Sequence, residues 1–387
     1  MNTLFDNLTV AANSRFPWRV ALLVNLKDDV VWHEDAPPDA GAEFDGYETA
    51  VSIMHALESD GHTVRLCAAD HTLPDALLDM RPDICFNIAE GIRGDAREAQ
   101  TPALCELLGL PYTASRVLAN ALSLDKTMTK RIWQQHGLPT APFQEFQTAV
   151  EPLDPALTFP LFVKPAREGT GMGIGPHAIV NNENELRQQV AWVLQTYRQP
   201  ALVEPFLPGR EFTVGFIGNR VQQTAELAER KRPYLYDRHG YHFFPILEID
   251  SRRCLTPGIY GVAAKSMPLA EQGAPGYLCP AEISPALQQQ LITITRQAAQ
   301  SLGVCDVSRI DFRLDADGRP MLLEINTLPG LNPTVSDLCI MAAAEGVAYN
   351  HLITEILYLA AARFGLYPVD LPAVSLDQEP AMEAAIY

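Results

Sequence analysis

The 387-residue sequence has no apolar run of the roughly 18 to 20 residues that a membrane-spanning helix needs. Its start, MNTLFDNLTVAANSRFPWR, lacks the basic segment and following apolar segment of a secretory signal peptide. Basic residues are also scarce, since 29 Lys and Arg stand against 47 Asp and Glu, a formal net charge of −18. A protein of this charge repels phosphate backbones. We therefore expect a cytoplasmic protein with neither a nucleic-acid nor a membrane partner.

The seven cysteines contain no CxxC pair, which removes the usual spacing of a zinc site or a redox motif. Their number is odd, which does not fit a disulfide framework, and most have apolar neighbours, as in DICFNI and ALCELLGL. They are typical of buried free thiols in a reducing compartment. Hydrophobic residues make up 47% of the chain and charged residues 20%, which is the composition of a globular protein with a sizeable core.

Short apolar segments alternate with helix-like segments in the first part of the chain. Strands are expected at VALLVNL (20–26), TVRLCAAD (63–70) and DICFNIAE (83–90). Between them lie YETAVSIMHALESDGHTV, whose apolar positions 51, 54 and 57 recur at helical spacing, and LPDALLDMRP. This alternation predicts a parallel sheet with right-handed crossovers. We place an N-terminal α/β domain at residues 1–117.

Two further domains are expected after it. ANALSLDKTMTKRIWQQHGLPTAPF (119–143) is predicted to form one amphipathic helix that ends near Gly137 and Pro139. A strand at 159–166, a glycine-rich segment and a helix at 183–199 complete a small α+β domain of residues 118–200. Residues 201–365 form a third, strand-rich domain, with helices at 284–302 and near 338–364, and residues 366–387 are a tail. The segment 225–258 receives no assignment.

The segment SRIDFRLDADGRPMLLEIN (308–326) alternates like two strands about Asp317-Gly318. With a two-residue turn there, Asp311 faces Glu324, and Asn326 lies on the same face of the hairpin. Like charges opposite each other destabilise a sheet unless something bridges them, and carboxylate and amide oxygens suit Mg²⁺. The alternative is an ordinary hairpin with a solvated acidic face.

The glycine-rich segment FVKPAREGTGMGIG (162–175) places Lys164 near a strand end. Backbone N–H groups of such a loop can surround phosphate oxygens while the lysine supplies positive charge. The spacing matches neither a P-loop nor a dinucleotide-binding fingerprint. A glycine-rich hairpin without a ligand is the alternative.

Four further residues have both a functional and a structural interpretation. Lys126 is either a second cation for a nucleotide or a solvated helix lysine. Glu204 and Glu211 flank a proline-containing bend and either accept hydrogen bonds from an adenine amine and ribose hydroxyls or are solvated acids. Gly330, in LPGLN, either presents its N–H to a developing oxyanion or simply forms a tight turn.

In this order, these segments resemble the ATP-grasp superfamily, and within it the D-alanine–D-alanine ligase family. The resemblance covers residues from about 85 to 335 and rests on LGLPYTASRVLANALSLDKTMTKRIWQQHGLPTAPF, FPLFVKPAREGTGMGI, ALVEPFLPGREFTVGFIGN, SRIDFRLDADGRPMLLEINTLPG and, more loosely, CPAEIS. It implies a three-domain α/β and α+β ATP-grasp fold with ATP between the central and C-terminal domains. It also implies ATP-dependent amide formation between small amino acid substrates through an acylphosphate, in a protein that is commonly a homodimer.

The resemblance also assigns roles to residues. It implies that Lys126, Lys164 and Lys265 bind the ATP phosphates, with Glu204 on the adenine side and Glu211 at the ribose. It implies that two Mg²⁺ ions (or Mn²⁺) are held by Asp311, Glu324 and Asn326. The tetrahedral intermediate is then stabilised by Arg309 and the N–H of Gly330, and Thr170 stands where the family has a serine in a loop that shields the intermediate.

Both amino-acid pockets depart from the family pattern. The glycine-rich element that carries the glutamate for the first substrate is missing, with Glu43 or Glu48 as the candidate substitutes. Ser266 replaces a tyrosine after the third lysine, and the serine for the second substrate falls near Val335 or Ser336. These departures favour a ligase for amino acids other than D-alanine over the cell-wall enzyme. A regulatory nucleotide-binding protein without turnover and a different ATP-grasp chemistry also stay open as hypotheses.

Overall fold

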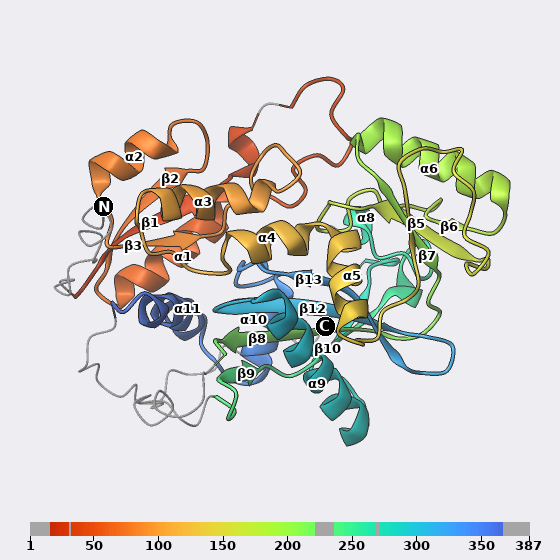
Figure 1. The fold of residues 1–387 in the computed structure, drawn as a ribbon. Helices are drawn as coiled ribbons and strands as arrows, with labels where there is room; N and C mark the ends of the chain where they lie inside the picture. Colours follow the sequence, from red (N-terminus) through yellow and green to blue (C-terminus); the bar gives the residue numbers. More distant parts are fainter. Residues whose placement is uncertain (1–15, 31, 221–235, 266, 268–270, 367–387) are drawn as a thin grey trace, which may run out of the picture.

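The computed structural model describes residues 16–30, 32–220, 236–265, 267 and 271–366, and its strands form three separate sheets (Figure 1). The first sheet is parallel, as the alternation of strands and helices predicted, and its strand order is β2-β1-β3. Its strands are β1 (Arg19–Val24), β2 (Thr63–Ala68) and β3 (Ile84–Asn87). The helices of this part are α1 (Tyr47–Ser59), α2 (Leu73–Met80) and α3 (Gln100–Leu107), the last preceded by the 3₁₀ turn η2 (Arg97–Ala99).

The buried face of α1 agrees only in part with the predicted positions 51, 54 and 57. Leu57 is fully buried in the core of the first sheet, as predicted, but Val51 and Met54 are only half-buried, and Ile53 is fully buried in their place. The reason is a tertiary one, because α1 packs against both β1 and the distant helix α11 (Tyr349–Arg363). A second set of apolar residues, from α2 and α3, covers the other face of the sheet.

The expected single helix over 119–143 is two helices, α4 (Val117–Leu124) and α5 (Lys126–Gln135). They are separated by Asp125, which has extended backbone angles and accepts hydrogen bonds from the N–H groups of Thr127 and Met128. This is an N-cap, so it starts a new helix instead of continuing the first. The cap fixes Lys126 at the first position of α5.

A second, antiparallel sheet has the order β4-β7-β5-β6 and carries helix α6 (Glu183–Tyr197) on one face (Figure 1). Its strands are β4 (Gln144–Phe146), β5 (Leu161–Pro165), β6 (Ile179–Val180) and β7 (Ala201–Pro205). The glycine-rich loop, residues 166–175, leaves the end of β5. The domain boundaries themselves remain predictions.

The third sheet is antiparallel, with the order β11-β10-β8-β12-β13 and β9 paired to β8. Its strands are β8 (Glu211–Gly218), β9 (Tyr241–Phe243), β10 (Leu247–Asp250), β11 (Gly276–Leu278), β12 (Val307–Leu314) and β13 (Pro320–Asn326). Helices α5 and α9 (Pro285–Leu302) pack on one face. Helices α10 (Asp337–Ala344) and α11 pack on the other face and join this sheet to the first domain. The single terminal helix expected near 338–364 is thus two helices, which Gly346, with φ of +84°, separates.

The hairpin of β12 and β13 pairs Asp311 with Glu324 and Arg309 with Asn326, as predicted. The predicted turn is wrong. The N–H of Asp315 donates a hydrogen bond to the main-chain oxygen of Arg319, so the turn between these two residues has three residues instead of two. Gly318, within this turn, has φ of +78°. A β-bulge between Asp311 and Phe312 compensates for the extra residue and restores the predicted register.

Within the described residues, no helix is both long and apolar enough to cross a membrane.

Candidate active site

Two adjoining cavities hold all eleven residues singled out from the sequence. The smaller, of about 80 Å³, lies between the second and third sheets. The larger, of about 220 Å³, opens toward the first domain. The smaller cavity is lined by Lys164, Glu204, Glu211 and Asp311, and the larger by Thr170, Arg309, Asn326 and Gly330. Lys126, Lys265 and Glu324 line both cavities, so they lie at their junction.

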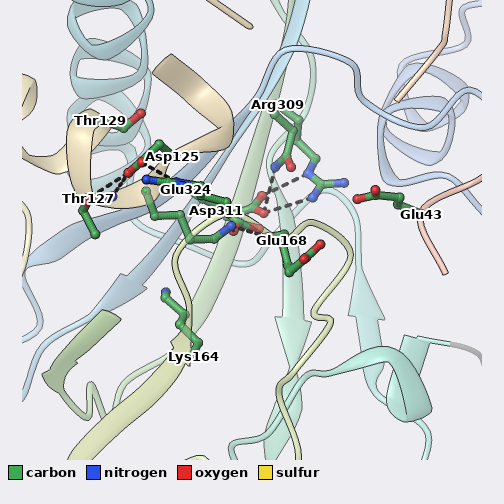
Figure 2. Close-up of polar contacts among 12 residues, drawn as sticks. Glu43, Asp125, Thr127, Thr129, Lys164, Glu168, Arg309, Asp311 and Glu324 are labelled. Carbon is green, nitrogen blue, oxygen red and sulfur yellow. Dashed lines mark hydrogen bonds and ion pairs between the residues drawn. The ribbon is translucent and has the colours of Figure 1, made fainter. Parts of the chain in front are cut away.

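Lys126 lies between the hairpin and the glycine-rich loop. Its Nζ is 3.2 Å from Glu324 Oε2 and donates a hydrogen bond to the main-chain oxygen of Glu168. Burial alone would raise the pKa of Glu324, but Lys126 and Lys164 outweigh it and hold the pKa well below its usual range. Glu324 is therefore an anion at the junction of the two cavities, and Figure 2 shows it close to Asp311.

Glu204 is held between two buried lysines. Its carboxylate oxygens lie 2.8 Å from Lys164 Nζ and 2.9 Å from Lys130 Nζ. Burial would raise the pKa of Glu204, but the two lysines lower it to about 2. Sequence reasoning missed Lys130, which lies one helical turn after Lys126 in α5 and is fully buried. The repeated four-residue spacing of lysines was the available signal, since it puts both on one face of the helix.

Arg309 is held in place by two carboxylates. Its Nε and Nη2 lie 3.0 Å from the two oxygens of Asp311, and its Nη1 lies 3.0 Å from Asp337 Oδ2 (Figure 2 shows the first pair). Burial would lower the pKa of Arg309, but both acids raise it above its ordinary value. Sequence reasoning also missed Asp337, the first residue of α10, because only the fold brings it to the hairpin.

Asp311 is also held by uncharged groups. Thr213 Oγ1 donates to Asp311 Oδ1 at 2.6 Å, and Asn326 Nδ2 donates to Asp311 Oδ2 at 3.2 Å. Because Asp311 faces Glu324 across the bulge, two carboxylates and the Asn326 amide gather on one face of the hairpin. These oxygen donors fit a hard divalent cation such as Mg²⁺.

Glu211 and Lys265 lie on the other side of the smaller cavity. Arg313 Nη1 is 3.5 Å from Glu211 Oε2, but burial outweighs it and raises the pKa of Glu211 to about 7. Lys265, at the end of α8 (Val262–Lys265), places its Nζ 4.8 Å from the centre of the Tyr260 ring. Ser266 lies outside the described residues.

The glycine-rich loop meets the segment before α8. Thr170 and Gly171 have φ of +53° and +77°, in the left-handed region. A Cβ atom on Gly171 would lie 2.9 Å from Gly261 Cα and 3.0 Å from the main-chain oxygen of Tyr260. The loop thus closes tightly over the junction of the two cavities, and only glycine fits at this contact.

Of the two candidate substitutes for the missing glutamate, the structure places Glu43 in the larger cavity. Arg97 Nη2 lies 2.8 Å from Glu43 Oε1 and 3.1 Å from Glu168 Oε2, and Nη1 donates to the Arg167 main-chain oxygen at 2.9 Å. Glu48 is exposed in the first turn of α1. Arg97 was not predicted, because it contacts residues 54 and 71 positions away.

Val335 and Ser336, the candidates near the second substrate, both line the larger cavity. Val335 is 68% exposed. Ser336 Oγ accepts a hydrogen bond from the N–H of Asn332 at 2.9 Å, and a Cβ on Gly330 would lie 2.8 Å from this oxygen. Ser336 is thus the hydroxyl next to Gly330.

Comparisons with known proteins show the family of this chain. The family model described as D-ala D-ala ligase C-terminus matches residues 132–358. A D-alanine–D-alanine ligase of Bordetella petrii is 37% identical over 261 residues, which cover 67% of this chain and 70% of the relative. The uncharacterised protein y4sG of Sinorhizobium fredii is 33% identical over 323 residues, covering 81% and 88%.

Among solved structures, that of D-alanine–D-alanine ligase from Bacillus anthracis complexed with ATP covers 90% of this chain and 98% of its own, with a TM-score of 0.66. At 19% identity this likeness shows the ATP-grasp fold. The family model spans more than half of the chain, and the two relatives exceed 30% identity. The chain therefore belongs to the D-alanine–D-alanine ligase family and is a ligase that forms a C–N bond.

Proposed function

We propose that the chain uses ATP to convert an amino acid carboxylate into an acylphosphate and then joins the acyl group to an amine. A carboxylate oxygen attacks the γ-phosphorus, and the bond to the β,γ-bridging oxygen breaks to release ADP. The amine then attacks the acyl carbon, phosphate leaves, and the amine loses one proton. The observation that carries this proposal is the junction of two cavities at Lys126, Lys265 and Glu324, because a phosphoryl group must pass from a nucleotide to the carboxylate of the amino acid.

The described residues have the chemistry for these steps. Lys126, Lys164 and Lys265 would bind phosphate oxygens, and Glu204 and Glu211 would accept hydrogen bonds from adenine and ribose. Asp311, Glu324 and Asn326 would hold the divalent cations, which neutralise the phosphate charge when bound.

At the acyl carbon, other groups act. Arg309 and the N–H of Gly330 would stabilise the oxyanion that forms when the amine attacks. Thr170, in the closed glycine-rich loop, would keep water from the acylphosphate. The homodimer expected from the family resemblance stays a prediction.

The test of this proposal is phosphate release with ATP and Mg²⁺ across single and paired D- and L-amino acids, with product masses. We expect Asp311→Asn to lower the turnover rate about 100-fold or more, since it removes a charge that would hold a cation at the transferred phosphate. The matched control is Asp317→Asn, which lies at the exposed tip of the same hairpin. Unchanged turnover in a folded Asp311→Asn variant would remove the metal assignment, and no release with any amino acid would reject ligation.

A further inference from the structure

The end of the larger cavity next to the first domain is strongly acidic. It is lined by Glu43, Asp45, Glu90, Glu98 and Glu168. Among the described residues, Arg97 forms ion pairs with Glu43 and Glu168 only. The other three carboxylates have no ion pair among the described residues, so this end of the cavity has more negative than positive groups.

Glu98 is the residue that most strongly indicates a ligand-binding site at this end of the cavity. Glu98 is 9% exposed, and no other described residue forms a hydrogen bond or an ion pair with its carboxylate. It lies on η2, the short turn that also carries Arg97 and that packs against α4. A buried carboxylate without a partner is costly, so it is retained where a ligand supplies the counter-charge.

The electrostatics agree with this geometry. Burial is the main cause that raises the pKa of Glu98 to about 8, even though Arg97 opposes it. Burial, followed by the charges of Glu98 and Glu43, raises the pKa of Glu90 well above its ordinary value. Burial also raises the pKa of Asp45 to about 6, although Thr49 donates a hydrogen bond to it. These carboxylates would hold their protons less tightly with a cation among them.

The cluster suits an organic cation better than a metal ion. No set of three or more His, Cys, Asp or Glu side chains in the described part of the chain is arranged to hold one. The walls beside the acids are instead apolar, with Phe86, Ile88 and Ile356 lining the same cavity. Apolar walls that lead to carboxylates suit a flexible methylene chain with a positive end.

We propose that the amino acid whose carboxylate is activated is a basic one, with an ammonium or guanidinium group on its side chain that binds Glu98 and Glu90. This inference rests on the proposed ligase function and names its substrate class. The α-carboxylate would lie toward Arg309 and Lys126 at the junction, and the α-ammonium would pair with one acid of the cluster. A neutral amino acid such as alanine has a single ammonium, which leaves Glu98 or Glu90 without a partner.

The test compares lysine, ornithine and arginine with alanine, in D and L forms, as the activated substrate. We expect a kcat/KM at least about tenfold higher for a basic amino acid, because its side-chain cation pairs with buried carboxyl groups that alanine leaves without a partner. Glu98→Gln keeps the shape of the side chain and should lower the ratio of kcat/KM for the basic substrate over alanine about tenfold, mainly through KM. Glu58→Gln, on the exposed part of α1, is the control that leaves this ratio unchanged.

Two results would overturn the inference and leave the ligase function intact: turnover that favours neutral amino acids, or a ratio that Glu98→Gln does not change. If no amino acid gives phosphate release, calorimetry measures the binding of lysine and alanine in the presence of a non-hydrolysable ATP analogue. This experiment separates a failure of the ligase function from a failure of the acidic subsite. If lysine binds more tightly than alanine, and Glu98→Gln abolishes this difference, the acidic subsite is supported and ligation is rejected. Equal binding, or none, would reject both.

Discussion

Two glutamates of this site show how strongly neighbouring cations set the state of a buried carboxyl. Glu204 is 3% exposed and Glu98 is 9% exposed. Lys130 and Lys164 lower the pKa of Glu204 to about 2, whereas burial raises the pKa of Glu98 to about 8. Within the part of the chain that the structure describes, Glu204 is thus paired and Glu98 is not. Only the second should lower the stability of the folded chain at neutral pH.

This difference predicts a pH-dependent effect of Glu98→Gln on stability. Above its ordinary pKa near 4.5, Glu98 ionises in the unfolded chain, but in the folded protein it keeps its proton up to about pH 8. The folded state therefore binds more protons between these values, and wild-type stability falls as pH rises through this window. Glu98→Gln removes this loss, so the variant should equal the wild type below about pH 5 and be more stable by roughly 2–4 kcal/mol above about pH 8.

Urea unfolding at pH 5, 7 and 9 measures this difference, with Glu58→Gln as the control for losing one surface acid. A variant that is less stable than the wild type at pH 9 would show that Glu98 has a partner in the folded protein. So would a stability difference that does not change with pH.

Among the structural elements, the glycine-rich loop is the part of the site whose shape depends most on single glycines. Replacing Gly171 by alanine would put a Cβ against main-chain atoms of Gly261 and Tyr260, which cannot rotate away. Together with the left-handed φ of +77°, this contact should displace the loop from the junction of the cavities. We expect Gly171→Ala to lower kcat/KM about tenfold or more, with a loss of only about 1–2 kcal/mol in the free energy of unfolding.

Gly175→Ala is the matched control for this loop. Gly175 has no atom within 4 Å of the position that a Cβ would take, and its φ is not in the left-handed region. Steady-state kinetics and thermal unfolding of the two variants separate loop placement from general stability. Equal losses in both variants would mean that the contact with Gly261 does not position the loop.

The elements that the sequence predicted best are those whose signal is local. The alternation of β12 and β13 gave the pairing of Asp311 with Glu324, although the turn is longer and a bulge corrects the register. The break between α4 and α5 at Asp125 also had a local signal, because an aspartate two residues before Thr127 is a common N-cap. The continuous apolar spacing across Asp125 nevertheless favoured a single helix. The buried face of α1 was predicted only in part, because α11, almost 300 residues later, also packs against this helix.

For the whole molecule, the order of the motifs was sufficient to bring the eleven predicted residues together, because each motif has a fixed place in the fold. The groups that hold them were not predictable in this way. Arg97, Lys130 and Asp337 act through contacts with residues far away in the sequence or on other elements, and only Lys130 had a local signal, its four-residue spacing from Lys126. The residues next to the reacting groups therefore follow from the sequence more readily than the residues that shape the substrate pockets.

The first and second domains are also joined by Asp39, and this contact leads to a test of their cooperation. Asp39 Oδ1 accepts a hydrogen bond from Tyr197 Oη at 2.7 Å, and Oδ2 accepts one from the N–H of Gly173 at 2.8 Å. The first bond reaches the end of α6 and the second reaches the glycine-rich loop, so one carboxylate holds two segments of the second domain. Burial and the bond to Asp39 raise the pKa of Tyr197, so its hydroxyl remains a donor over the whole range of activity assays.

We expect Asp39→Ala to free the glycine-rich loop. Losing two partly buried hydrogen bonds should speed hydrogen exchange in residues 167–175 about tenfold, which corresponds to roughly 1.4 kcal/mol, and should raise the KM for ATP. Asp35→Ala is the matched control, because Asp35 also pairs across the domains, with Arg198 at 2.6 Å, but both side chains are about two-thirds exposed. An exposed pair of this kind contributes little, so its loss should leave exchange and KM unchanged. If both variants exchange alike, Asp39 does not hold the loop, and its placement depends on its other contacts, with Gly261, Lys126 and Arg97.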